Sequence, residues 1–168
     1  TEPLITFPDL ANASRGLGAL SIQNDMDSVL RKIPLLIQYK DGFYPSLSLQ
    51  AIIHYLSISE KNILLDTQQR TITLKGAKHP DILHSQQVTT EDIIIPVNNR
   101  GEMIVNFIGP WERLTHYDFA DIFLASDSMD EMEMWTEELS NKIVIISEVT
   151  TGVSDIGPVP TDTSFPLS

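Results

Sequence analysis

The apolar residues of this chain are divided into short runs, and clusters of turn-forming residues stand between most of them. The longest runs cover residues 33–37, 93–97 and 143–146. A membrane-spanning helix needs roughly 18 or more consecutive apolar residues, so none of these runs has the length to cross a bilayer. Runs this short, bounded by turn residues, are typical of β-strands. The pattern therefore favours a sheet built largely from hairpins.

Three hairpins are expected. The paired runs are residues 19–23 with 29–39, 63–65 with 71–74, and 93–97 with 103–107. Residues 24–27 and 98–101 favour turns, because short polar side chains bond their own backbone and glycine accepts a positive φ. Residues 75–90 are polar, contain Gly76 and Pro80, and show no sustained period. They are expected to form a loop or an insertion.

Three helices are expected, at residues 45–57, 117–125 and 128–140. Pro45 and Ser46 can open the first, because a proline in the first turn loses no needed hydrogen bond. Its apolar side chains then recur at three- and four-residue spacing, which predicts a buried face. Ser128, with Glu131 three residues later, matches a capping box at the start of the third helix.

Residues 142–146, Lys-Ile-Val-Ile-Ile, follow the last expected helix directly. A continuous apolar run of strand length is typical of a strand covered on both faces, so this segment is expected to be the buried central strand. The fold class is then α/β. It is a mixed, largely hairpin-built β-sheet with a buried central strand (142–146) and covering helices (45–57, 117–125 and 128–140).

Length and composition restrict the class of protein. With 168 residues, 42% of them hydrophobic, the chain has the size and apolar content of one domain. Eleven basic residues against 23 acidic ones give a net charge of −12. This charge repels a phosphate backbone, so no nucleic acid partner is expected. The chain has no cysteine, which excludes disulfides and thiol chemistry. It begins at Thr1 without an initiator methionine, so we expect a piece of a longer protein.

No strong catalytic or metal-binding signature is present in the sequence. His79 and His84 have the spacing of no established zinc motif, and residues 24–27 lack the glycine and glutamate that complete a calcium loop. Residues 152–157 are one position out of register for a nucleophile elbow. The acidic residues between 127 and 138 have the helical spacing of a solvated face. We therefore expect no cofactor and no metal, although the absence of these motifs does not by itself exclude an enzyme.

Several short segments, taken in order, resemble one family of sensory domains. They are residues 14–18, 29–36, 44–47, 95–96, 104–110, 117–122 and 142–146, followed by Gly152 and Asp155. Each segment is weak alone, but their shared order is specific. The chain resembles the CHASE-type domain, type two, which is the cyclase/histidine-kinase-associated sensory extracellular domain.

The resemblance implies an extracytoplasmic, non-catalytic sensory domain of a bacterial membrane protein. Family members are anchored by transmembrane helices and joined to histidine kinase, nucleotide cyclase or serine/threonine kinase output domains. Residues 1–168 would then be a single sensory domain, forming the C-terminal portion of a longer one that begins with a further βα region. The sequence departs from the family's pattern directly after the expected central strand. The family's isoleucine-glycine-alanine-threonine is replaced here by Ile146 and residues 147–150, Ser-Glu-Val-Thr, so a ligand carried by that loop can differ.

An unknown small-molecule ligand, if bound, is sought where strand ends meet loops. The candidate ligand-binding residues are Arg31, Tyr44, Asn106, Trp111, Arg113, Thr151 and Asp155. The arginines can pair bidentately with an anionic group, the aromatic rings offer flat apolar contact, and the polar side chains bond polar edges. Each residue also has a purely structural interpretation, as a surface ion pair, a core aromatic residue or a turn cap.

Two other functions stay open at this point. A hydrolase would use Asp155 and Glu148 with His116 or His84 as base, and it would require strongly perturbed titrating groups in one cleft. A dimerisation or protein-interaction module would use strand edges or one helix face, with a homodimer or a partner protein as the assembly. That helix face carries Met129, Met132 and Trp135.

Overall fold

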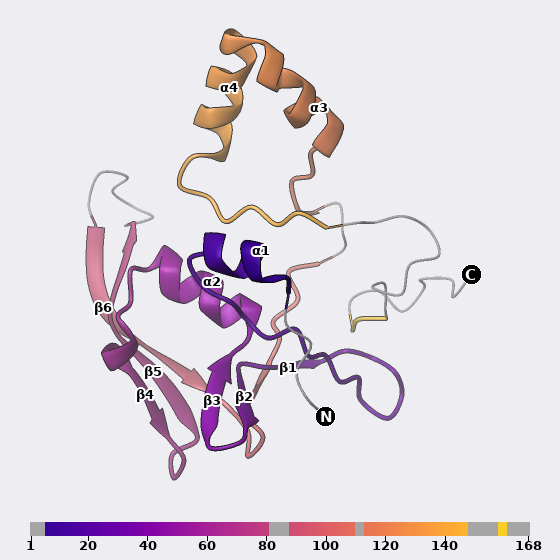
Figure 1. Cartoon of the computed structure of the whole chain (residues 1–168). Coiled ribbons are helices and arrows are strands. Elements are labelled where there is room, and N and C mark those ends of the chain that lie inside the picture. Colours follow the sequence, from indigo (N-terminus) through magenta and orange to yellow (C-terminus); the bar gives the residue numbers. More distant parts are fainter. Residues whose placement is uncertain (1–5, 81–87, 110–112, 148–157, 161–168) are drawn as a thin grey trace. The chain divides into compact units, whose positions relative to one another are not determined.

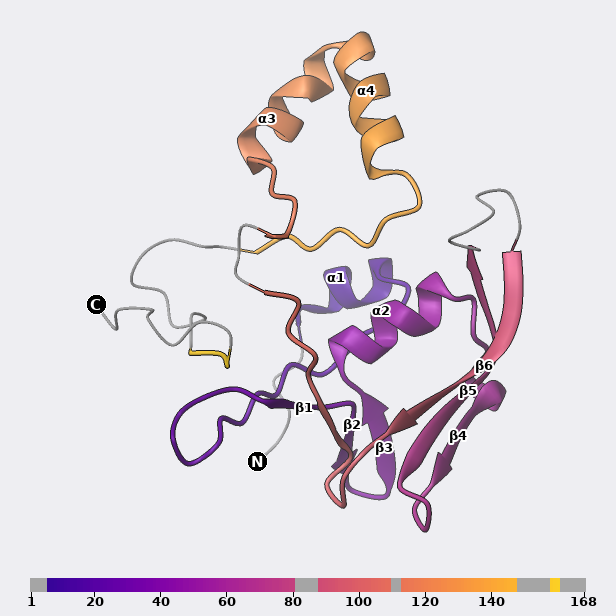
Figure 2. The same cartoon turned by 180° about the vertical axis from the view of Figure 1, so that it is seen from behind.

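The computed structural model describes residues 6–80, 88–109, 113–147 and 158–160 (Figure 1, Figure 2). The chain divides into two compact units. Residues 1–24 and 32–105 form the first unit, and residues 25–31 and 106–168 form the second. The chain therefore leaves the first unit after residue 24, returns at residue 32 and leaves it again after residue 105.

The first unit contains antiparallel sheets and two helices. Its described elements are α1 (Pro8–Ala13), β1 (Lys32–Pro34), β2 (Leu36–Tyr39), β3 (Gly42–Pro45), α2 (Leu47–Tyr55), the 3₁₀ helix η1 (Glu60–Asn62), β4 (Ile63–Asp66), β5 (Thr71–Pro80), β6 (Val88–Pro96) and β7 (Glu102–Ile104). Strand β1 pairs with β7, and β2 pairs with β3. The third sheet has the order β4-β5-β6.

Helix α2 supplies one side of the hydrophobic core of the first unit (Figure 1). Ser46 caps it, because the Ser46 hydroxyl oxygen accepts a hydrogen bond from the Leu49 N–H at 3.3 Å. Leu49 and Ile53, one turn apart, are buried in the same cluster as Ile72 and Leu74 of β5. Full burial of a side chain of this size stabilises the fold by about 1.5–3 kcal/mol. The expected helix at 45–57 is thereby confirmed, but Pro45 ends strand β3 and does not open the helix.

Gly18 allows the N-terminal segment to approach the start of α2. A Cβ atom at Gly18 would lie closer than van der Waals contact to the Leu47 backbone nitrogen, at 2.6 Å. The adjacent Ala19 N–H donates to the Pro45 carbonyl at 2.9 Å, and the Leu47 N–H donates to the Ala19 carbonyl at 3.0 Å. Gly18 therefore serves close backbone packing at this point.

Strands β5 and β6 are longer than the sequence predicts. Residues 75–80 continue β5, and residues 88–90 begin β6, so the expected loop at 75–90 is wrong at both of its ends. The register shifts between Leu74 and Ala77, where Gly76 has a φ of +65°. The Gly76 N–H donates to an Asp92 carboxylate oxygen at 2.9 Å. This bulge breaks the period-two pattern, which is why the sequence showed no strand there.

Of the three expected hairpins, only the one between residues 63–65 and 71–74 is confirmed, as β4 and β5. Residues 19–23 do not pair with 29–39, because β1 pairs with β7 and β2 pairs with β3. Residues 93–97 and 103–107 do not pair with each other either. A turn does form at 98–101, with the Asn98 N–H donating to the Glu102 carbonyl at 2.9 Å. Beyond that turn, β6 and β7 belong to different sheets.

The second unit contains a helical hairpin of α3 (Phe119–Leu124), the 3₁₀ helix η3 (Ala125–Asp127) and α4 (Met129–Leu139). Asp118 caps α3 by accepting from the Ala120 N–H at 3.0 Å. Ser128 caps α4 by accepting from the Glu131 N–H at 3.4 Å. The expected helices at 117–125 and 128–140 are therefore confirmed, and so is a mixed α/β fold class.

The start of α3 and the end of α4 are tied together by an aromatic and polar cluster. The rings of Tyr117 and Trp135 meet edge to face, with centroids 5.0 Å apart. The Tyr117 hydroxyl donates to a Glu138 carboxylate oxygen, which also accepts from Lys142. The hydrogen bond from Lys142, which is the larger cause, and the hydrogen bond from Tyr117 lower the pKa of Glu138. The same bond to Glu138 raises the pKa of Tyr117.

The expected buried central strand at 142–146 is wrong in this structure. Residues 143–147 have no regular secondary structure, and Ile145 and Ile146 are 83% and 77% exposed. β-branched residues favour strands, but a strand also needs a paired neighbour, and the described residues provide none for residues 143–147.

The expected covering role also differs among the helices. Helix α2 contributes buried residues to the first unit, whereas α3 and α4 belong to the second unit and contain no buried residue.

Candidate functional site

The segment 25–31 forms a compact loop in the second unit. The Ser28 N–H donates to the Asp25 carbonyl at 2.9 Å, and the Asp25 N–H donates to the Val29 carbonyl at 3.1 Å. Asp27 reinforces the loop by accepting from the Val29 N–H at 3.2 Å. Ser28 adopts a positive φ of 65° at the turn. These bonds within the loop bring the side chains of Asp25, Asp27 and Arg31 together.

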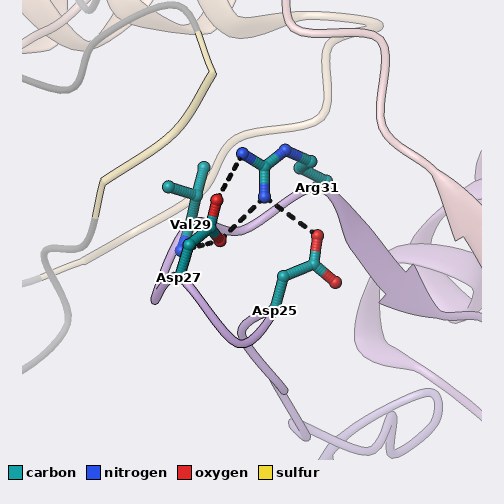
Figure 3. Close-up of polar contacts among 4 residues, drawn as sticks. All are labelled: Asp25, Asp27, Val29 and Arg31. Carbon is teal, nitrogen blue, oxygen red and sulfur yellow. Dashed lines mark hydrogen bonds and ion pairs between the residues drawn. The ribbon is translucent and has the colours of Figure 1, made fainter.

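Arg31 is held by two carboxylates (Figure 3). Its Nη1 donates to Asp25 Oδ2 at 3.1 Å and to Asp27 Oδ1 at 2.9 Å. Its Nη2 donates to Asp27 Oδ2 at 2.8 Å. The contact with Asp27 is bidentate, which fixes the plane of the guanidinium as well as its position.

The electrostatics of this cluster follow from its geometry. The hydrogen bond from Arg31, followed by that from the Val29 N–H, lowers the pKa of Asp27 from 3.8 to about 2. The hydrogen bond to Asp27, which is the larger cause, and the hydrogen bond to Asp25 raise the pKa of the Arg31 guanidinium. The side chains of Arg31 and Asp27 are 40% and 55% exposed, so water screens the pair. The ion pair therefore orders the loop more than it stabilises the fold.

This arrangement determines which ligand the guanidinium can accept. A guanidinium has five N–H donors. Three of those of Arg31 are used by Asp25 and Asp27, while Nε–H and the second Nη2–H have no partner among the described residues. One positive and two negative groups give the cluster a net negative charge. The free edge therefore suits a neutral carbonyl or hydroxyl oxygen better than the anionic group that the sequence suggested.

The loop is also connected to the other end of the second unit. The Leu30 N–H donates to the Pro158 carbonyl at 3.0 Å. Val29, beside Leu30, is among the few buried residues that the structure describes in this unit. A ligand that changed the loop would therefore change the environment of residues 158–160.

Among the described residues of the second unit, neither Asn106 nor Arg113 forms a hydrogen bond with Arg31. Tyr44 lies in β3 of the first unit, exposed, with its ring 6.4 Å from that of Tyr39. Asn106 follows β7 and is exposed, and Arg113 is exposed beside Gly109. Trp111, Thr151 and Asp155 lie outside the described residues. The roles of all seven remain predictions.

Sequence reasoning treated Asp25 and Asp27 as turn residues and missed that they hold Arg31. The four-residue separation of Asp27 and Arg31 was no signal by itself, because acidic and basic side chains at that spacing meet on a helix and this segment is a loop. The separation of Asp25 and Arg31 carries no signal either, since only the folded loop brings them together.

A second feature that the sequence did not indicate is a pocket in the first unit. Its volume is about 240 Å³. It is lined by Ile33, Leu35, Ser48, Leu49, Ile52, Ile95 and Met103. No charged side chain lines it, so it can hold apolar groups but offers no acid or base for chemistry.

The residues proposed for a hydrolase do not form a site in the described part of the chain. Glu148, Asp155 and His84 lie outside it, and His116 is exposed. The described residues hold no group of three or more histidine, aspartate or glutamate side chains placed to bind a metal ion. None of the described helices combines the length and the hydropathy that spanning a bilayer requires.

Comparison with known proteins gives one family. The model of the CHASE2 domain matches residues 2–167, which is nearly the whole chain. No curated protein and no solved structure matches the chain.

Proposed function

Because this chain belongs to the CHASE2 domain family, a family of sensory domains, we propose that it is the extracytoplasmic ligand-sensing input domain of a bacterial membrane-anchored signalling protein. The domain itself is non-catalytic. Its output is a histidine kinase, a nucleotide cyclase or a serine/threonine kinase. The observation that carries the proposal is the family match over residues 2–167.

We place the polar part of the ligand site at the loop 25–31. The Arg31 guanidinium is held in one plane by Asp27 and still offers two N–H donors along one edge. A neutral oxygen-bearing ligand would bind this edge without displacing either carboxylate. Binding would change the population of loop arrangements, and the bond from Leu30 to Pro158 would pass that change to residues 158–160.

The ligand is tested by thermal denaturation of the purified chain against neutral metabolites, anionic metabolites and divalent metals. A ligand that binds only the folded state at 100 times its Kd stabilises it by about 2.7 kcal/mol. We expect a saturable rise of Tm from a neutral oxygen-bearing compound. Arg31→Ala should abolish the rise, while Arg100→Ala, at an exposed turn of the first unit, should leave it unchanged.

The possible results separate the two parts of this proposal. A saturable shift that survives Arg31→Ala would move the site away from the loop but keep a ligand-sensing domain. A shift produced by anions alone would contradict the preference for neutral ligands. The absence of any shift across all compounds would contradict small-molecule sensing.

The location is tested in cells with the membrane protein that carries this domain. Residues 1–168 contain no cysteine, and Met26 is fully exposed on the loop, so Met26→Cys introduces the only thiol of this domain. A membrane-impermeant maleimide should label this thiol in intact cells, with the unsubstituted protein as background. Labelling that appears only after lysis would contradict the extracytoplasmic placement.

A further inference from the structure

Helices α3 and α4 form a hairpin (Figure 1). Large apolar side chains are exposed along α3 and over the first turn of α4. Phe123 and Leu124 end α3 and are 66% and 64% exposed, and Met129 begins α4 at 90%. Phe119 stacks on Phe123, with ring centroids 6.3 Å apart, and Met132 follows Met129 by one turn. We call these five residues the apex surface. All five side chains are exposed, from 41% for Met132 to 90% for Met129.

The chain around the apex surface is strongly acidic. Residues 117–141 contain eight aspartates and glutamates and no lysine or arginine. Asp121, Asp127, Asp130 and Glu133 are exposed and have no cationic partner among the described residues. An apolar surface surrounded by unpaired carboxylates is complementary to an apolar surface surrounded by cations.

The underlying hairpin is fixed at several points. Ser128 caps α4, and Ala125 is buried at the bend. The contact between Tyr117 and Trp135 holds the opposite ends of the two helices together. The apex surface is therefore presented on an ordered element, which reduces the entropy lost when a partner binds.

From this combination of apolar and acidic groups we propose that the apex surface binds a basic amphipathic helix of another protein. Methionine and phenylalanine side chains fit the apolar face of such a helix, because methionine adapts its shape to the partner. Lysines and arginines beside that face would meet the unpaired carboxylates. A second copy of this chain is disfavoured as the occupant, because it would bring a second set of carboxylates against the first.

The proposal is tested with a designed peptide of 18 residues, built from leucine and lysine so that all leucines lie on one helical face. One control peptide has the same composition in scrambled order, and the other has glutamate in place of lysine. Binding to the purified chain is measured by calorimetry at low and at physiological salt. We expect binding of the amphipathic basic peptide alone, with an affinity that falls as salt rises.

Substitutions locate the peptide on the chain. The double variant Phe123→Ser with Met129→Ser removes exposed apolar groups and should weaken binding about tenfold or more. Asp130→Asn with Glu133→Gln should weaken binding and also reduce its dependence on salt. Met26→Ser is the matched control, because Met26 is an exposed methionine outside the hairpin, and it should bind like the unsubstituted chain. Circular dichroism of each variant shows whether its helices remain folded.

Several results would overturn the proposal. These are equal binding of the scrambled peptide, equal binding of the acidic peptide, no binding at all, or binding unchanged in the Phe123→Ser and Met129→Ser variant. Self-association at neutral pH that this variant abolishes would instead make a second copy the occupant. Arg31→Ala should not alter peptide binding, so failure of this proposal is distinguishable from failure of the ligand site at the loop.

Discussion

The Arg31 guanidinium meets the Asp27 carboxylate through two parallel hydrogen bonds, from Nη1 to Oδ1 at 2.9 Å and from Nη2 to Oδ2 at 2.8 Å. The two residues are four positions apart, on a loop closed by the backbone bond from the Asp25 N–H to the Val29 carbonyl. This contact fixes the plane of the guanidinium on a loop of turn-forming residues. It leaves two N–H donors of Arg31, along one edge of the guanidinium, without a partner among the described residues. For this reason we propose the loop, and not a cleft between strand ends, as the polar part of the ligand site.

The first prediction concerns titration of Asp27. Its pKa in the folded chain should be about 2, and Arg31→Gln should raise it towards 3.8 because the largest cause of the shift is then lost. A lowered carboxyl pKa stabilises the fold above the unfolded value, and that contribution disappears as pH falls from about 4 through 2. Carboxyl chemical shifts followed by NMR measure the pKa. Arg100→Gln is the control and should leave Asp27 unchanged.

The second prediction concerns Tyr117 at the base of the helical hairpin. Its pKa should lie above the ordinary value of 10.0, because the hydroxyl donates to the Glu138 carboxylate. Glu138→Gln removes the charge and should return the pKa towards 10.0, whereas Glu137→Gln should not. Ultraviolet titration of tyrosinate, with Tyr117→Phe used to assign the signal, measures this. A titration curve unaffected by Glu138→Gln would show that the contact is absent in solution.

The third prediction concerns the core of the first unit. Leu74 on β5 is fully buried, so Leu74→Ala should reduce the free energy of unfolding by about 2–5 kcal/mol. Leu64 on the paired strand β4 is 44% exposed, and Leu64→Ala should cost about 1 kcal/mol. Urea denaturation of the two variants compares them directly. Equal losses would mean that β5 is not the central strand of its sheet.

Local signals in the sequence predicted the elements that depend on neighbouring residues. The spacing of Leu49 and Ile53 indicated α2, and Ser46 and Ser128 marked the starts of α2 and α4, where the structure places their capping bonds. The hairpin of β4 and β5 also followed, because a short polar turn joins two apolar runs.

Pairings between distant segments could not be predicted in the same way. Strand β1 pairs with β7, which lies far from it in the sequence of the first unit. No periodicity in residues 32–34 identifies that partner. The bulge beside Gly76 hid the continuation of β5, because it shifts which side chains share a face. The contacts of Arg31 with Asp25 and Asp27 could not be predicted either, because both depend on the folded loop.

The last prediction addresses residues 142–146, where the sequence pattern and the structure differ. The sequence indicates a strand buried on both faces, whereas the structure leaves Ile145 83% exposed. A buried isoleucine replaced by lysine places an unpaired charge in the core, which prevents folding, while an exposed one tolerates the change. Exposed β-branched runs also promote aggregation, and a charge within the run opposes it.

Ile145→Lys should therefore fold with a free energy of unfolding within about 0.5 kcal/mol of the unsubstituted chain, and it should aggregate more slowly. Ile72→Lys is the matched comparison, because Ile72 has no exposed surface and the same substitution should unfold the first unit. Urea denaturation and light scattering measure both effects. If Ile145→Lys unfolds the chain as Ile72→Lys does, residues 142–146 form a buried strand in solution, as their sequence alone indicates.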